Sequence, residues 1–213
     1  EAFIRGFYGK PRVDLKLLRQ HAGGLIALSA CLAGAVPQRI MENDYEAAKA
    51  YALELAEIFG PGNFYLELQD HGIAVQKTVN QGIYRLARET GLPMVVPNDA
   101  HYLRKEAAAI QDVLLCVQTA KTVDDPNRMR FETEEFYIKS EDELRNLFPD
   151  MDEAFVNTVQ IAARCNVEFS FNEYKLASFP APQGYTDESY VSELCEQGVR
   201  DRYAPPPREY RQR

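Results

Sequence analysis

Several patterns that would assign a chemistry directly are missing from this 213-residue sequence. It has no Gly-rich phosphate loop, no nucleophile elbow and no His-Glu-x-x-His pattern. The sequence therefore gives no support to P-loop nucleotide hydrolysis, serine-hydrolase chemistry or zincin chemistry. It also lacks a closely spaced acidic pair of the sort that holds two magnesium ions for nucleotidyl transfer. No catalytic residue is assigned, and no small-molecule substrate or organic cofactor is evident.

Cysteine is sparse and scattered, and long apolar runs are absent. The four cysteines, Cys31, Cys116, Cys165 and Cys195, form no Cys-x-x-Cys motif, so reduced thiols in a cytoplasm fit them best. No apolar run approaches the ~20 residues of a membrane span, and the first residues have no signal-peptide architecture. We expect a soluble, cytoplasmic protein without a membrane partner.

Positive charge is also in short supply, with 24 Lys and Arg against 32 Asp and Glu and a net charge of -8. This balance argues against a surface whose main task is to hold nucleic acid electrostatically. Two places are locally dense in arginine. They are Arg128 with Arg130, and the end of the chain around Arg208, Arg211 and Arg213. A solvated surface is the simplest interpretation of both.

What the sequence does contain is an alternation of strand-like and helix-like segments. Three short apolar runs, at 24–30, 64–70 and 92–99, end in small or polar residues, as buried strands do. Helical periodicity separates them. The first helical segment covers about 43–59, with Tyr51, Leu55 and Ile58 as its stripe, and the second carries Val79, Ile83, Leu86 and Ala87. Strands that alternate with helices predict a parallel α/β architecture.

Beyond His101 the pattern becomes mainly helical. Ile110, Leu114 and Val117 mark one helix, "DDPNRMRF" is typical of an exposed turn, and "EFYIKS" is a short strand candidate. Ser140 and Glu143 form a capping-box pattern that starts a short helix, and Phe155, Val159 and Ala162 mark the next. We expect a domain boundary near residue 178, then a loop and a final helix over about 187–203.

The residues most suggestive of chemistry follow the third apolar run. In extended backbone, Asp99 and His101 would project to the same side, which is the geometry of a metal-ligand pair. Cys31, after the first run, would add a thiolate suited to a borderline ion such as zinc. The alternative remains open that Asp99 caps the following helix, His101 satisfies a core carbonyl and Cys31 is a small buried hydrophobe.

Three other residues are weaker candidates. Glu67 alternates with Leu66 and Leu68, so its side chain could face a barrel interior or solvent. His71 stands in "QDHG", which is also typical of a turn. His21 is expected near a helix end, where an imidazole complements the helix dipole.

Six ordered blocks closely resemble the amino-terminal region of the bacterial replicative DNA polymerase III alpha subunits. They are "GLIALSACLAGAVP", "FYLELQDHGI", "GLPMVVPNDAHYL", "IQDVLLCVQTAKTVDD", "RMRFETEEFYIKS" and "CNVEFSF". The resemblance covers essentially the whole chain. It implies that residues 1–178 are the carboxyl-terminal part of a polymerase-and-histidinol-phosphatase (PHP) domain, and that 179–213 are a linker and the start of the palm. The implied fold is part of a distorted barrel of seven β/α units with a mainly helical extension.

The resemblance also implies a site and a function. Cys31, Asp99 and His101 correspond to the last three ligands of the family's divalent metal cluster, which would hold zinc, manganese or magnesium. The family's early His-x-His motif and the ligands that follow it are absent, so we expect weak or no metal binding by this chain. The implied function is DNA synthesis in the longer protein, with a PHP region that scaffolds or acts as a 3'-5' exonuclease, and with DNA and other replicase subunits as partners. A stand-alone PHP phosphoesterase is the alternative.

Overall fold

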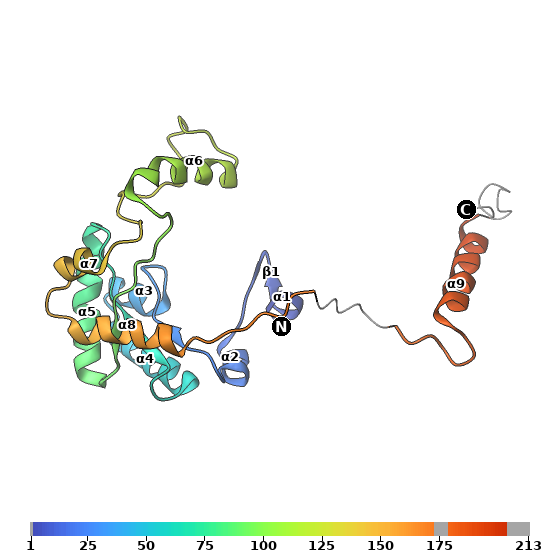
Figure 1. Cartoon of the computed structure of the whole chain (residues 1–213), viewed down its shortest axis with the longest axis horizontal. Coiled ribbons are helices and arrows are strands. Elements are labelled where there is room, and N and C mark those ends of the chain that lie inside the picture. The colour runs from blue at the N-terminus through green and yellow to red at the C-terminus, as the bar shows by residue number, and fades with distance from the viewer. Residues whose placement is uncertain (1, 173–178, 204–213) are drawn as a thin grey trace. The chain divides into compact units, whose positions relative to one another are not determined.

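A computed structural model describes residues 2–172 and 179–203 of the chain. The chain divides into two compact units, Glu1–Asn166 and Val167–Arg213, which are drawn together in Figure 1. The boundary predicted near residue 178 falls outside the described residues.

The first unit is built on a small parallel sheet. Strand β4 (Phe64–Glu67) lies between β3 (Ala27–Leu28) and β5 (Met94–Val95), and both pairings are parallel. Helices α3 (Ala35–Met41) and α4 (Tyr45–Phe59) connect β3 to β4, and α5 (Ala74–Thr90) connects β4 to β5. The predicted α/β alternation is therefore confirmed, with three parallel strands in the described part of the chain.

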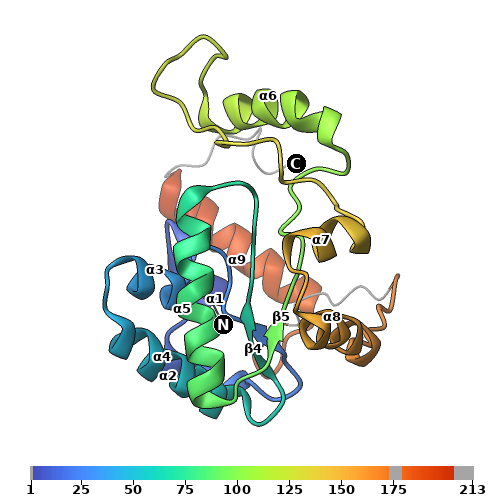
Figure 2. The same cartoon turned by 90° about the vertical axis from the view of Figure 1, so that its left-hand side faces the viewer.

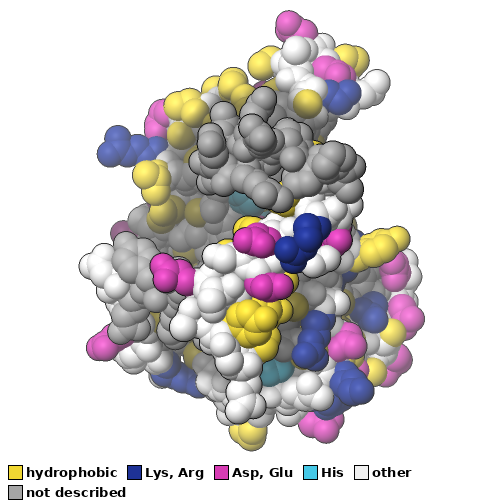
Figure 3. All heavy atoms as spheres, turned by 90° about the vertical axis from the view of Figure 1, so that its right-hand side faces the viewer, with side chains coloured by type: hydrophobic (Ala, Val, Ile, Leu, Met, Phe, Trp, Pro, Cys, Tyr) yellow, Lys and Arg dark blue, Asp and Glu magenta, His cyan; other side chains and the backbone are white. Residues whose placement is uncertain are grey.

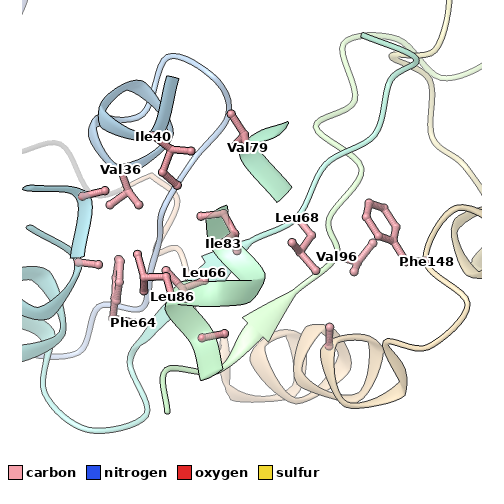
Figure 4. Close-up of a cluster of buried hydrophobic side chains, with 14 of the residues drawn as sticks. Val36, Ile40, Phe64, Leu66, Leu68, Val79, Ile83, Leu86, Val96 and Phe148 are labelled. Atoms are coloured by element: carbon pink, nitrogen blue, oxygen red, sulfur yellow. The ribbon is translucent and has the colours of Figure 1, made fainter. Parts of the chain in front are cut away.

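Helix α5 packs against the sheet through one apolar face. Its predicted apolar stripe, Val79, Ile83, Leu86 and Ala87, is buried as expected. All four residues of β4 are also buried, which explains why its sequence reads as an almost continuous apolar run. Figure 4 shows Ile83 and Leu86 of α5 beside Leu66 of the sheet. Gly91 ends α5 in a left-handed conformation, with φ of 72°.

Helix α4 is confirmed, but its most buried residues are not the predicted ones. Ala48 and Ala52 are completely buried, whereas Tyr51 and Leu55 are only partly buried at the edge of the same core. The small side chains let α4 approach α3 closely, while the larger ones cover the margin of the contact. Asp44 starts the helix by accepting a hydrogen bond from the Ala47 amide at 3.1 Å.

Helix α6 (Ala108–Thr119), which follows a 3-10 turn η1 (Lys105–Ala107), was predicted correctly as a helix but not in its orientation. The predicted stripe is exposed: Ile110 by 64%, Leu114 by 54% and Val117 by 75%. Leu115 and Cys116 are buried instead. Figure 2 shows α6 on an arm that extends away from the sheet, which explains why its apolar face has no core to cover.

The strand predicted at "EFYIKS" is wrong, because Tyr137 forms only an isolated parallel bridge with Tyr102. The capping box is confirmed: Ser140 and Glu143 satisfy each other's amides at the start of α7 (Glu141–Leu147). Helix α8 (Asp152–Arg164) buries Phe155 as predicted.

The rest of the predicted α8 stripe is wrong, because Val159 and Ala162 are exposed. Asn157 lies on the buried side instead. Its amide donates to the Met94 carbonyl at 2.9 Å, which fastens α8 to β5.

The first residues form a small substructure that the sequence patterns did not indicate. Helix α1 (Ala2–Arg5) precedes an antiparallel hairpin of β1 (Phe7–Tyr8) and β2 (Lys10–Pro11), and α2 (Leu15–His21) follows. As expected, His21 ends a helix.

In the second unit, α9 (Asp187–Arg202) confirms the predicted final helix. It begins with a capping box in which Thr186 and Ser189 bond each other's amides. On the face shown in Figure 3, acidic and basic side chains are interspersed with hydrophobic ones. No helix among the described residues is long and apolar enough to cross a membrane.

Candidate metal site at the strand ends

The carboxyl ends of β3 and β4 are joined by a buried serine. Ser29, which is 4% exposed, accepts a hydrogen bond from the Glu67 amide at 2.8 Å through its hydroxyl. The Glu67 side chain is also buried, and it accepts hydrogen bonds from the Gln69 amide group and the Ala30 backbone N–H. Burial raises the pKa of Glu67, and the nearby negative charge of Asp99 raises it further. The sheet thus brings the Asp99 carboxylate toward the ends of the other two strands.

Asp99 and His101 are brought together, although not by the geometry that the sequence suggested. Asp99 Oδ1 lies 3.8 Å from His101 Nε2, and both side chains are partly exposed. Strand β5 ends at Val95, and Asp99 has a φ of 44°, in the left-handed region. The expectation of extended backbone is therefore wrong at this position. A left-handed turn, which Asp tolerates better than most residues, produces the same juxtaposition.

The structure does not support the alternative in which Asp99 caps the following helix and the His101 ring satisfies a core carbonyl. The next helical turn begins after Arg104, so Asp99 is not its cap. The backbone N–H of His101, rather than its ring, donates to the Phe136 carbonyl at 2.8 Å. The imidazole is held between aromatic side chains, with its centroid 4.7 Å from Phe131 and 5.6 Å from Phe136. Its position is therefore set by packing and by the backbone.

His71 has a structural role in this arrangement. It is 2% exposed and stacks on Phe136 at 4.2 Å. Its Nδ1 accepts from the Gln76 side chain at 2.8 Å, which leaves Nε2–H to donate to the Asn98 carbonyl at 3.0 Å. Burial lowers the pKa of His71, which favours the neutral ring. Because both nitrogens are engaged, His71 has no lone pair to offer a metal.

A buried polar network around His71 was missed by the sequence patterns. Gln76 also accepts from the His71 amide at 2.7 Å, and Asn80 donates to the Gln69 carbonyl at 2.9 Å. Gln76 and Asn80 stand four residues apart on the inner face of α5, beside Val79. Two amides on an otherwise apolar helix face are the signal that would have identified this network.

The described residues supply only part of the donor set that a divalent ion requires. Two donors 3.8 Å apart can both reach one ion at ordinary coordination distances of about 2.0–2.2 Å. Within residues 2–172 and 179–203, however, no three His, Cys, Asp or Glu side chains are grouped closely enough to hold a metal. Cys31 is partly buried and the structure does not bring it into such a group with Asp99 and His101. Its assignment as a ligand stays a prediction.

The chain is similar in sequence to a known domain family and to known proteins. Residues 1–71 match the family described as PHP domain. The chain is 45% identical over 208 residues to the DNA polymerase III subunit alpha of Thermus aquaticus, covering 95% of this chain and 17% of the relative. Identity is 43% over 205 residues to the same subunit of Treponema pallidum, covering 96% and 18%. The chain thus spans less than a fifth of the length of these relatives. Nearly the whole chain is therefore similar to one region of these DNA polymerase III alpha subunits, and its first 71 residues match the PHP domain.

Proposed function

We propose that this chain is the PHP-containing region of a bacterial replicative DNA polymerase alpha subunit and serves DNA-templated DNA synthesis within a longer protein. The observation that carries the proposal is the 45% identity to the Thermus aquaticus subunit, which extends over 95% of the chain. DNA and other replicase subunits are the partners that this role requires. The part of the polymerase that joins nucleotides would lie outside these residues.

We further propose that Asp99 and His101 are metal ligands at the strand ends, with Cys31 as a third. The proposal is supported by the 3.8 Å separation of the two side chains and by the aromatic packing that orients His101. A bound divalent ion would supply an activated water for phosphoester hydrolysis, as in 3'-5' exonuclease chemistry. Because the described residues provide an incomplete donor set, we expect weak binding.

A chimaera tests the polymerase assignment. The corresponding region of the Thermus aquaticus subunit is replaced by this chain, and primer extension by the purified protein is measured. Retained extension is the expected result, whereas a folded chimaera without extension would contradict the assignment. The isolated chain, assayed with manganese or zinc on a phosphomonoester, should show no turnover. Efficient hydrolysis there would favour the stand-alone phosphoesterase instead.

Metal binding is tested separately by elemental analysis after equilibrium dialysis against zinc or manganese. Asp99→Ala and His101→Ala should each lower the amount of metal retained. Asp150→Ala, which removes an exposed carboxylate elsewhere, is the matched control. Unchanged stoichiometry in both site variants would contradict the ligand assignment.

A further inference from the structure

The first twenty residues are strongly basic within an acidic protein. Residues 1–20 contain five Lys or Arg and two carboxylates, Glu1 and Asp14, while the whole chain carries a net charge of -8. One of the five, Arg19, is committed to the body of the protein through an ion pair of 2.8 Å with Glu54 of α4. The others are Arg5, Lys10, Arg12 and Lys16. Arg5 ends α1, Lys10 lies in β2, Arg12 directly follows β2 and Lys16 lies in α2. We call these four residues, together with the β1–β2 hairpin, the basic hairpin.

The backbone of the basic hairpin is closed by Gly6. Its amide donates to the Ala2 carbonyl at 3.1 Å, and its carbonyl accepts from the Arg12 amide at 3.0 Å. A Cβ atom at position 6 would lie 2.1 Å from the Arg12 carbonyl oxygen, so only glycine permits this closure. The consequence is that Arg5 and Arg12, seven residues apart in sequence, line the same cavity.

That cavity has a volume of about 530 Å³, within the range of small-molecule sites. Its lining includes Arg5, Arg12, Lys16, Asp14 and Gln20. The carboxylate of Asp14 is engaged as the N-cap of α2, where it accepts from the Leu17 amide at 2.7 Å. Arg12 and Lys16 form no ion pair with any residue in the described part of the chain. The cavity is therefore a cationic pocket whose acidic neighbour is already hydrogen-bonded.

Aromatic rings stand next to these cations and face solvent. Phe3 is 73% exposed, Phe7 56% and Tyr8 82%. The guanidinium carbon of Arg12 lies 6.0 Å from the centroid of the Tyr8 ring. Exposed aromatic faces beside cations such as Arg12 and Lys16 are the two elements with which proteins bind single strands, because the bases stack and the phosphates are neutralised.

We propose that the basic hairpin is a binding site for single-stranded nucleic acid, with phosphates at Arg12 and Lys16 and a base stacked on Tyr8. An anionic membrane surface is the less suitable partner, because α1 has only four residues and cannot present an amphipathic face. The site goes beyond the proposed function and is independent of the metal ligands. Failure of either can therefore be recognised without the other.

The test is fluorescence anisotropy with a labelled oligothymidylate of about 16 nucleotides at low salt. The wild-type chain should bind, and Arg12→Ala combined with Lys16→Ala should weaken binding by about tenfold or more. The slope of log affinity against log salt should fall by about 1.4, since each contact with a single strand contributes about 0.7. Tyr8→Ala should weaken binding by about fivefold without changing the slope, because it removes stacking and no charge.

The matched control is Lys77→Ala combined with Arg88→Ala, which removes the same charge from exposed positions of α5. It should bind within about twofold of wild type. Equal losses in the control and the hairpin variant would overturn the proposal, because binding would then follow net charge alone. So would absence of wild-type binding to the oligonucleotide, including the case in which the hairpin instead binds vesicles that contain phosphatidylserine.

Discussion

The side chain of Asn98 forms hydrogen bonds with both backbone groups of Lys139. Its Oδ1 accepts from the Lys139 amide at 2.8 Å, and its Nδ2 donates to the Lys139 carbonyl at 3.2 Å. Since the Asn98 carbonyl also accepts from His71, one residue joins the end of β5, the loop after β4 and the segment that leads into α7. This pairing holds Phe136 over the ring of His71.

Asn98→Ala should therefore lower the free energy of unfolding by about 1–3 kcal/mol, because it leaves two backbone groups without their partners. Asn98→Asp keeps the acceptor but loses the donor, so it should also destabilise the protein. Urea unfolding measures both variants, with the exposed Asn127→Ala as control. A midpoint for Asn98→Ala equal to that of the control would show that the pairing contributes nothing.

Glu143 should make stability sensitive to strongly acidic pH. The Tyr137 hydroxyl donates to its carboxylate at 2.7 Å, and this bond, with the Ser140 amide and hydroxyl, lowers the pKa of Glu143 to about 2 from 4.5. The folded pKa is below the unfolded one, so the contribution is present above pH 4.5 and is lost as pH falls to about 2. Glu143→Gln should flatten the pH dependence of stability over that interval, as measured by thermal unfolding. An unchanged profile would contradict the assignment.

The hydrogen bond between Tyr137 and Glu143 should also make stability depend on pH in the alkaline range. Hydrogen bonding to Glu143 raises the pKa of Tyr137 to about 12. For a phenol whose folded pKa exceeds its unfolded value of 10.0, the contribution is present below pH 10 and is lost as pH rises through about 12. Burial also raises the pKa of Tyr45 and of Tyr84. An ultraviolet titration that follows phenolate formation should therefore show a phase near pH 12 that Tyr137→Phe reduces by one tyrosine. Persistence of that phase at full size in the variant would assign it to other tyrosines.

Sequence periodicity predicted the α/β layer well because a single core determines it. Ile83 and Leu86 repeat at helical spacing and cover β4, so the pattern and the burial have the same cause. The same rule was wrong for α6, where Ile110 and Val117 are exposed. An apolar helix face shows that something could cover it, but it does not show that the covering element lies within these residues.

The sequence predicted that Asp99 and His101 lie together, but it did not predict the backbone conformation that brings them together, and the place of Cys31 in the site stays a prediction. Asp99 and His101 do lie together, yet the cause is a left-handed turn that local sequence does not reveal. The contact of Asn98 with Lys139 joins positions 41 residues apart, and periodicity carries no information on such a pair. The burial of Lys139, whose ammonium group lies beside Glu135, was not predicted either, because it depends on contacts with distant parts of the chain.

Gly82 should resist substitution although it lies inside a helix. Alanine normally favours a helix interior by about 1 kcal/mol over glycine. At position 82, however, a Cβ atom would lie 2.7 Å from Ile40 Cγ2 and 2.9 Å from its Cδ1. Ile40 belongs to α3 and packs into the core beside α5, as Figure 4 shows. Gly82→Ala should therefore lower the free energy of unfolding by about 1–3 kcal/mol through overpacking.

A double-mutant cycle separates this clash from other effects of the substitution. Ile40→Ala alone should destabilise the protein by about 2–5 kcal/mol, because it leaves a cavity. In the Ile40→Ala background, Gly82→Ala has room for its methyl group and gains helix propensity, so it should become neutral or stabilising. Urea unfolding of the four proteins should give a coupling free energy of about 1–3 kcal/mol. Additive effects would mean that α3 moves aside, and that Gly82 is not required for the close approach of α3 and α5.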